Sequence, residues 1–325
     1  MNENTKSKVL IAVDGSDRSL EAVRYAAGLV SSETTEVVLF HVMNRRPEGA
    51  WFWELEKVSE PRQDLDVLED AANRHEKHIQ KFMAEAVQLF VKQGISEEAV
   101  HSVITDINNG VARDILEQAG SDCDAVIVGR QGLSSVELKG HLIGSTTNRL
   151  AAHMKDVPLW IVGGVPDPEK ILIAMDETLI SIKALDYVAK MISGTEAHVL
   201  LVHVMRELHI FPREHEKFCT LEEKENLISK TEEDIKIAET RACDVFAEAT
   251  TRLKQAGIAP ERIDNKILTR MASRASAIVE EAHKNGCGTI VIGRRGLSDL
   301  EDLFLGSMSN KVLQIAEDLA VWLVQ

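Results

Sequence analysis

Short, continuous apolar runs rich in valine and isoleucine recur along the chain, and longer helix-patterned stretches lie between them. Most of these runs do not alternate with polar residues, which is typical of strands buried on both faces, as in a parallel sheet. Alternation of strands and helices with right-handed crossovers predicts a doubly wound α/β fold. The predicted strands are Val9–Val13, Val37–Val42, Val100–Thr105, Ala125–Val128 and Leu159–Val162, then Ile171–Met175, His198–Val204, Ile263–Leu268, Thr289–Ile292 and Val321–Val324.

Two long amphipathic helices are expected, one in each half of the chain. The first covers Leu65–Lys92. The second covers Leu221–Gln255, where Thr220 and Glu223 have the spacing of a capping box and Gly257 is placed to end the helix.

The sequence repeats itself with an offset of 162 residues, which is the size of a whole domain. One motif, Gly-Arg-x-Gly-Leu-Ser, repeats with an offset of 164. We therefore predict two tandem domains of similar fold, residues 1–164 and 168–325, joined by a Gly/Pro linker at 163–168. The paired segments are Lys8–Asp14 with Lys170–Asp176, His41–Met43 with His203–Met205, Gly129–Ser134 with Gly293–Ser298, and Gly144–Ser145 with Gly306–Ser307.

The net charge of the chain argues against two classes of binding partner. The chain of 325 residues has a net charge of −15, which argues against a nucleic-acid surface and against attraction to anionic membranes. The sequence contains neither an apolar stretch of membrane-spanning length nor a signal-peptide core, so we expect a cytoplasmic protein. The four cysteines form no CxxC pair and are expected to be reduced.

The glycine motif of the second half has a spacing suited to phosphate. Gly293 and Gly296 follow a predicted strand, and Gly306-Ser307 opens the predicted final helix Met308–Glu317. Glycine lets the backbone approach a phosphate, and the start of a helix supplies unpaired N–H groups. In the first half Gly129, Gly132 and Gly144-Ser145 occupy the same places, with two more residues before Gly144.

These motifs resemble the universal stress protein family, and the resemblance covers nearly all of both halves. G-x2-G-x9-G-(S/T) is the family's ATP-binding pattern. The resemblance implies two tandem, mainly parallel five-stranded sheets of the adenine-nucleotide alpha-hydrolase-like, Rossmann-like type, with strand order 3-2-1-4-5. It also implies ATP, with or without magnesium, as ligand. The implied binding residues are Asp176, Val204, Gly293, Gly296, Gly306 and Ser307, with Asp14, Val42, Gly129, Gly132, Gly144 and Ser145 in the first half.

Several readings stay open from the sequence. The spacing favours the second half as the binding copy, because the two extra residues in the first half either bulge outward or misplace Gly144. Asp14 and Asp176 either contact the ligand or cap a helix. We expect His41 to be packed framework. His75 is placed on a solvent-facing helix surface, where His75-Glu76-Lys77-His78 lacks the spacing of a metal-binding HExxH motif.

No catalytic residue and no metal ligand is predicted, so any ATP hydrolysis is expected to be slow. The leading hypothesis is a stress-response or signalling protein in which nucleotide acts as a conformational or assembly switch. The alternatives are a nucleotide-free scaffold acting through protein association, or a slow ATP-hydrolysing enzyme. The terminal strands of the two halves, Leu159–Val162 and Val321–Val324, are expected to pair as an intrachain pseudo-dimer, and a homo-oligomer is also compatible with this pattern.

Overall fold

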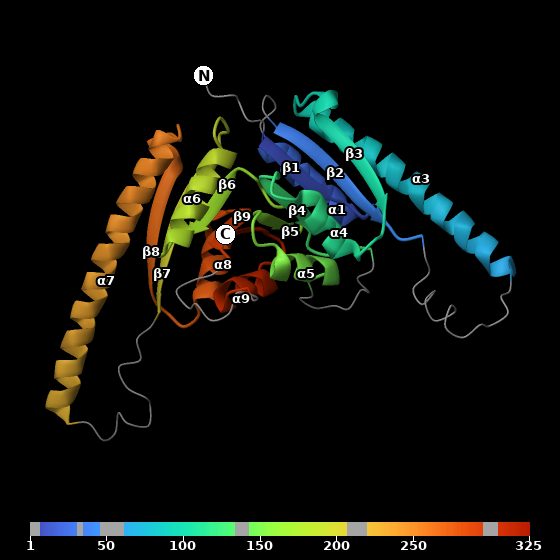
Figure 1. Ribbon diagram of the computed structural model, residues 1–325. Coiled ribbons are helices and arrows are strands. Elements are labelled where there is room, and N and C mark those ends of the chain that lie inside the picture. Colours follow the sequence, from blue (N-terminus) through green and yellow to red (C-terminus); the bar gives the residue numbers. More distant parts are fainter. Residues whose placement is uncertain (1–6, 31–34, 46–61, 134–142, 207–219, 295–304) are drawn as a thin grey trace. The chain divides into compact units, whose positions relative to one another are not determined.

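The computed structural model describes residues 7–30, 35–45, 62–133, 143–206, 220–294 and 305–325. The chain divides into two units, Met1–Val165 and Pro166–Gln325. Both have the same plan, a parallel sheet with helices packed on its faces (Figure 1).

Unit 1 contains five parallel strands in the order β3-β2-β1-β4-β5. The chain order reverses between β1 and β4, which is the topological switch point of the sheet. Val9, Leu10 and Ile11 of β1 are fully buried, because strands cover both of its edges and helices cover its faces. The strands are β1 (Ser7–Ala12), β2 (Thr35–Met43), β3 (Val100–Asp106), β4 (Ala125–Gly129) and β5 (Leu159–Val162).

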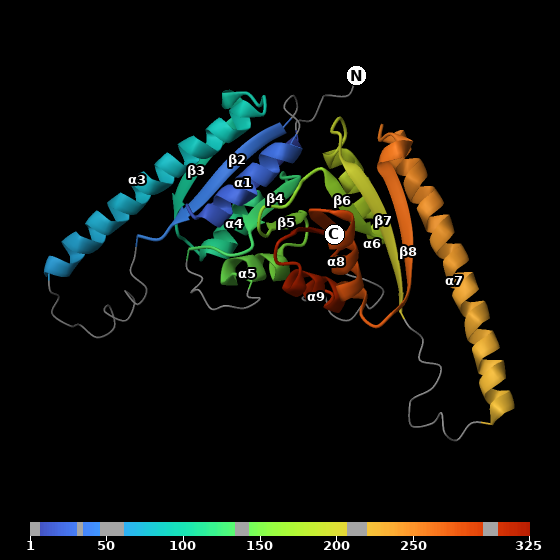
Figure 2. The ribbon, with the colours of Figure 1, turned by 180° about the vertical axis from the view of Figure 1, so that it is seen from behind.

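The helices of unit 1 follow the strands along the chain. The helix α1 (Asp17–Leu29) begins at Ser16, whose side chain accepts a hydrogen bond from the N–H of Ser19. The long helix α3 (Arg62–Lys92) packs on α1 and β2 through its C-terminal half and extends beyond the sheet at its other end (Figures 1 and 2). A 3₁₀ turn (Glu97–Ala99) precedes β3. The two remaining helices are α4 (Val111–Ala119) and α5 (Ser145–His153).

Unit 2 repeats this arrangement with the order β8-β7-β6-β9-β10, again parallel throughout. Its helices include α7 (Leu221–Gln255), which begins with the predicted capping box of Thr220 and Glu223. The strands are β6 (Lys170–Ala174), β7 (His198–Arg206), β8 (Ile263–Met271), β9 (Thr289–Gly293) and β10 (Ala320–Val324). The other helices are α6 (Leu179–Met191), α8 (Arg274–Asn285) and α9 (Ser307–Ile315), and a 3₁₀ turn covers Pro260–Arg262.

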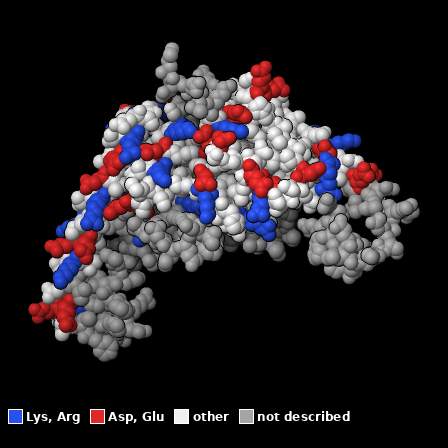
Figure 3. All heavy atoms as spheres, in the orientation of Figure 1, with Lys and Arg blue, Asp and Glu red and all other residues white. Residues whose placement is uncertain are grey.

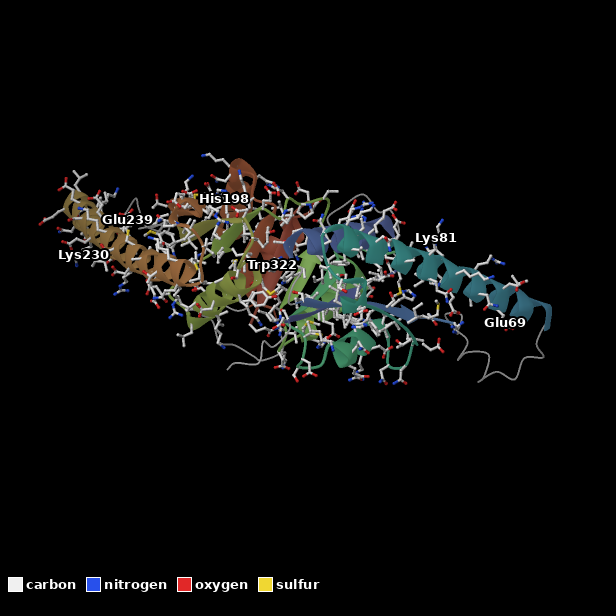
Figure 4. The ribbon with its side chains drawn as sticks, turned by 90° about the horizontal axis from the view of Figure 1, so that it is seen from above. Glu69, Lys81, His198, Lys230, Glu239 and Trp322 are labelled. Carbon is white, nitrogen blue, oxygen red and sulfur yellow. The ribbon has the colours of Figure 1, made fainter. Side chains whose placement is uncertain are left out.

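The same aromatic pair fills the core beside the last strand of each unit. Trp160 of β5 meets Tyr25 edge-on at 6.2 Å between ring centroids, and Trp322 of β10 meets Tyr187 in the same way at 6.0 Å. Figure 4 shows Trp322 inside its unit, whereas Glu69 and Lys81 project outward from α3. Edge-to-face contacts of this kind add to the area that each ring buries.

The surface carries both charge signs side by side. Along α7, at the left of Figure 3, acidic and basic side chains alternate. Arg252 of that helix binds Glu248 one turn away at 2.8 Å and Asp186 of α6 at 2.9 Å. Arg252 therefore links two carboxylates, one of its own helix and one of α6.

The predicted fold class is confirmed. The first and last residues of each predicted strand differ by at most three positions from those of the observed strand. Pairing of β5 with β10 across the two units stays a prediction. No helix in the described ranges is both long and apolar enough to span a bilayer.

Candidate functional site

Unit 1 has a cavity of about 510 Å³ at the carboxyl ends of β1, β2 and β4. Its wall comes from the strand ends, the glycine loop after β4, the starts of α1, α4 and α5, and His75 of α3. A volume of this size is within the range of small-molecule sites. All six residues that the sequence singles out in the first half line it, namely Asp14, Val42, Gly129, Gly132, Gly144 and Ser145.

Asp14 joins two parts of the cavity wall. Its Oδ1 accepts hydrogen bonds from the N–H of Ser16 at 3.0 Å and from the Ser16 hydroxyl at 2.6 Å. Its Oδ2 accepts from the N–H of Leu133 at 2.7 Å. The carboxylate thus shapes the turn before α1 and also holds the glycine loop. Asp14 therefore holds Ser16, the N-cap of α1, and it lines the cavity as well.

Two glycines of this motif, Gly129 and Gly132, lie close to neighbouring atoms of the protein. A Cβ at Gly132 would collide with Oδ2 of Asp14, and one at Gly129 would stand 3.2 Å from the carbonyl oxygen of Arg18. Gly144 is less crowded, with its nearest neighbours at 3.4 Å. Gly144 is therefore the position where a small side chain changes the cavity with the least effect on the fold.

The start of α5 is anchored to the end of β4. The N–H of Gly144 donates to the carbonyl of Arg130 at 2.9 Å, and the Thr147 hydroxyl donates to the carbonyl of Gly129 at 2.9 Å. The N–H groups of Ser145, Thr146 and Thr147 belong to the first turn of α5, so they have no carbonyl partner within the helix. Three amides and the positive end of the helix dipole consequently lie at the cavity wall, an arrangement suited to an anion.

His41 lies at the base of the cavity near the end of β2 and is only 4% exposed. Its Nδ1 is 2.7 Å from the carbonyl oxygen of Val13. Burial is the main cause that lowers the pKa of His41 below its ordinary value of 6.5, so the ring is held neutral. Its place in the packed framework agrees with the expectation from the sequence.

His75 is a correction to the expectation of a solvent-facing position. The residue lines the cavity, and its ring stands edge-to-face against His41 with centroids 5.5 Å apart. His75, Ile79, Phe82 and Ala86 follow each other at steps of four, three and four, so they share one helix face. Because Ile79, Phe82 and Ala86 are apolar, the spacing predicts that His75 lies on the face of α3 that packs on the sheet, but it does not identify His41 as its neighbour.

Asp114 helps to position the cavity wall, and the sequence analysis did not predict this role. It is buried in α4 and accepts hydrogen bonds from the N–H groups of Asn108 and Asn109 at 2.9 and 2.8 Å. These contacts fix the loop between β3 and α4. Val111 and Ile115 of α4 in turn line the cavity.

In unit 2 the predicted residues take equivalent positions. Asp176 accepts from both the N–H and the hydroxyl of Thr178. The N–H of Gly306 donates to the carbonyl of Arg294 at 3.0 Å, and the Ser309 hydroxyl donates to Gly293 at 2.8 Å. The start of the helix is thus anchored alike in both units, so the two extra residues of the first half leave Gly144 in place. Ser307 is the first residue of α9, and Gly296 lies outside the described residues.

The end of β7 differs from the end of β2. In unit 1, Val42 and Met43 pair with consecutive residues of β3. In unit 2 the register between β7 and β8 shifts immediately after Val204. The strand end that carries Val204 is therefore irregular, whereas the one that carries Val42 is regular.

The arginines of the two glycine motifs are buried. Arg130 and Arg294 are each 3% exposed, and Arg130 is not among the described residues that line the cavity of unit 1. Loss of hydration, together with the nearby charge of Arg18, lowers the pKa of Arg130. Among the described residues, no group of three or more His, Cys, Asp or Glu side chains could hold a metal ion together.

The fold and the motifs define a tandem α/β protein, and its family follows from the comparisons. The chain belongs to the universal stress protein family, whose model matches residues 6–163 and again residues 168–322. It is similar to the universal stress protein YxiE of Bacillus subtilis (strain 168), with 29% identity over 147 residues, which cover 45% of this chain and 93% of the relative.

Two solved structures share the tandem fold over nearly the whole chain. A universal stress protein from Archaeoglobus fulgidus matches with a TM-score of 0.55 and 16% identity, covering 97% of each chain. The functionally unknown protein PA1789 from Pseudomonas aeruginosa matches with a TM-score of 0.54 and 16% identity, covering 98% of this chain and 92% of its own. At these identities the likeness supports the fold alone.

Proposed function

We propose that unit 1 binds an adenine nucleotide, ATP in the first instance, in the cavity at the carboxyl ends of β1, β2 and β4. The observation that carries this proposal is that the cavity gathers all six predicted binding residues of the first half. The site also lies at the switch point of the sheet, which is where doubly wound α/β proteins bind ligands.

The two ends of the cavity have different chemistry. At one end the first-turn amides of α5 and the hydroxyls of Ser145 and Thr146 suit phosphate oxygens. At the strand ends the backbone of Val42 suits the edge of a base, and the apolar side chains of Val111 and Ile115, which also line the cavity, suit its flat faces. A nucleotide matches this division, because its phosphates and its base lie at opposite ends of the molecule.

The sequence spacing favours unit 2, whereas the contacts described above favour unit 1. Gly144 keeps the same anchoring bond as Gly306 despite the two extra residues, and the strand end at Val42 keeps a regular register. Unit 1 also presents Ser145-Thr146 where unit 2 has Ser307-Met308. We therefore infer that unit 1 is the higher-affinity site, with unit 2 as a second, weaker site.

The bound nucleotide is proposed to act as a conformational or assembly switch in a stress response. Ligand that binds the folded state stabilises it in proportion to its concentration and affinity. The residues of the glycine loop up to Leu133 and the start of α5 lie next to the proposed phosphate position, so they are the described segments that such binding contacts most directly.

Calorimetric titration with ATP and with GTP tests this proposal. ATP should bind at no more than two sites, and more tightly than GTP. Identification of any small molecule released by heating the purified protein gives an independent readout. Absence of ATP binding at about millimolar concentration, a limit of roughly −4 kcal/mol, would leave the nucleotide-free scaffold as the better reading.

A further inference from the structure

His41 presents a buried nitrogen that has no partner. Its Nδ1 lies 2.7 Å from the carbonyl oxygen of Val13. A carbonyl only accepts hydrogen bonds, so Nδ1 carries the proton. In the neutral ring Nε2 is then a lone-pair acceptor. Among the described residues, no donor reaches this buried atom.

The position of this acceptor points to a ligand. Buried polar groups are almost always satisfied, so an orphaned one calls for an explanation. His41 is one of the cavity-lining residues, next to Val13 and Val42 at the end proposed for the base. We propose that Nε2 of His41 accepts a hydrogen bond from an amino group of the bound base, which makes His41 a determinant of specificity for amino-substituted purines. This inference rests on the proposed nucleotide site.

In this proposal, His75 is the residue that covers the acceptor. Its ring stands edge-to-face against His41 at 5.5 Å, and it lines the same cavity. Unlike His41, His75 is partly exposed at the surface of α3, where side chains change rotamer rapidly. A rotation of His75 opens Nε2 to the ligand, and the amino group then replaces the contact with the imidazole ring.

Unit 2 provides a natural comparison. His203 repeats the fixed ring of His41, with Nδ1 2.9 Å from the carbonyl oxygen of Met175. The residue of α7 that corresponds to His75 is Ala238, because Ile79 and Phe90 of α3 align with the buried Ala242 and Leu253. His203 is accordingly more exposed than His41. The paired histidines are therefore a property of unit 1.

Two isosteric substitutions separate the nitrogens of His41. In His41→Asn the side-chain amide occupies the position of Nδ1, so the donor to Val13 is kept and the acceptor is lost. In His41→Gln the amide reaches the position of Nε2, so an acceptor is kept and the donor to Val13 is lost. His203→Asn is the matched control in unit 2.

The experiment measures the affinity of each variant for ATP and for purine riboside triphosphate, which lacks only the 6-amino group. Wild type should prefer ATP by about five- to tenfold, the value of one hydrogen bond. His41→Asn should lose this preference, whereas His41→Gln and His203→Asn should keep most of it. Equal affinities of wild type for the two ligands, or an unchanged preference in His41→Asn, overturn the inference and leave nucleotide binding intact. If wild type binds neither ligand, the proposed function itself fails.

A second measurement uses the wild-type protein, so it does not depend on whether a variant folds. In protein with ¹⁵N-labelled histidine, long-range ¹H–¹⁵N spectra report the tautomer of each ring. The His41 ring should be protonated on Nδ1, and its Nε2 resonance should move by several ppm with ATP and not with the 6-deamino analogue. An Nε2 signal that responds equally to both ligands contradicts the assignment, because the change then comes from the phosphates or from excluded water.

Discussion

Asp14 and Leu133 are 119 positions apart in the sequence, and the carboxylate of the first accepts the backbone N–H of the second at 2.7 Å. This bond connects the end of β1 to the loop that follows β4. The other oxygen of the same carboxylate holds the turn that opens α1. One side chain thus sets the relative position of three segments of the cavity wall.

Replacing Asp14 by Asn should loosen this wall. The amide offers one acceptor oxygen in place of two, so either the turn at Ser16 or the loop at Leu133 loses its bond. We expect the free energy of unfolding to fall by about 1–2 kcal/mol, since the site is only partly buried, and nucleotide affinity to fall with it. Urea denaturation and titration with ATP measure the two effects. Asp156→Asn, at an exposed carboxylate, is the control, and equal effects of both substitutions would contradict this role.

Substitution of Gly144 should act on binding more than on folding. Its backbone is in an ordinary extended conformation, and an added Cβ meets neighbours at 3.4 Å. A valine there narrows the approach to the α5 amides, so ATP affinity should fall by at least about tenfold, or roughly 1.4 kcal/mol. Gly306→Val makes the same change in unit 2, and calorimetry on both variants assigns the sites. If the two variants and their double mutant bind like wild type, the glycines serve only as turns.

The stability of unit 1 should depend on pH through His41. Its pKa in the folded protein is lowered below 6.5 by burial first, and by the neighbouring His75 in addition. As the pH falls below 6.5 the unfolded chain takes up this proton before the folded protein does. The contribution of His41 is therefore present above that pH and is lost as the pH falls through the folded pKa.

Denaturation at about pH 7.5 and about pH 5.5 compares wild type with His41→Asn. The wild type should lose more stability between the two conditions, because the variant lacks the titrating ring. In His75→Ala the ring of His41 should titrate at a higher pH than in wild type, as followed by NMR. An unchanged pKa of His41 in His75→Ala would show that His75 contributes neither to the burial of the His41 ring nor to the electrostatic repulsion of its proton.

The cysteines should differ sharply in reactivity. Burial raises the pKa of Cys287 to about 11, and it raises that of Cys123 as well, whereas Cys243 is exposed on α7. At about pH 8 only about one Cys287 in a thousand is a thiolate. With Cys219 replaced by serine, iodoacetamide should modify Cys243 rapidly and the two buried thiols only after unfolding. Mass spectrometry of samples taken at successive times measures the order in which the cysteines are modified. Early modification of Cys287 would contradict its burial.

The pairing of β5 with β10 is tested by placing a charge on each strand. Ile161 and Leu323 are buried, and Ile161→Asp or Leu323→Asp should open an interface between the units and expose the linker at 163–168 to proteases. Circular dichroism of the same samples provides the control, because retained helix and strand content separates loss of the interface from loss of a unit. Cleavage at the wild-type rate in folded variants would show that these strands do not meet.

The sequence predicts most of this framework because buried parallel strands leave continuous Val and Ile runs. The ends of strands are predicted less accurately from the sequence where a strand lies at the edge of a sheet. In β8 the polar residues Asp264, Asn265 and Lys266 interrupt the apolar pattern. The convergence of Asp14, Val42 and the glycines was predictable from the rule that ligand sites lie at the carboxyl ends of strands. The approach of His75 to His41 depends on how α3 packs across β2, which local periodicity does not specify.

The anchoring bonds at the start of α5 and α9 have a consequence for how two copies diverge. Thr147 and Ser309 tie their helices to the preceding strand, and Gly144 and Gly306 add a backbone bond in each copy. These contacts are internal, so the position of each helix start does not have to be assembled by a ligand. A copy that loses its ligand chemistry by mutation still keeps this architecture. Duplication of such a domain therefore releases one copy to drift toward a new task while the other retains the old one.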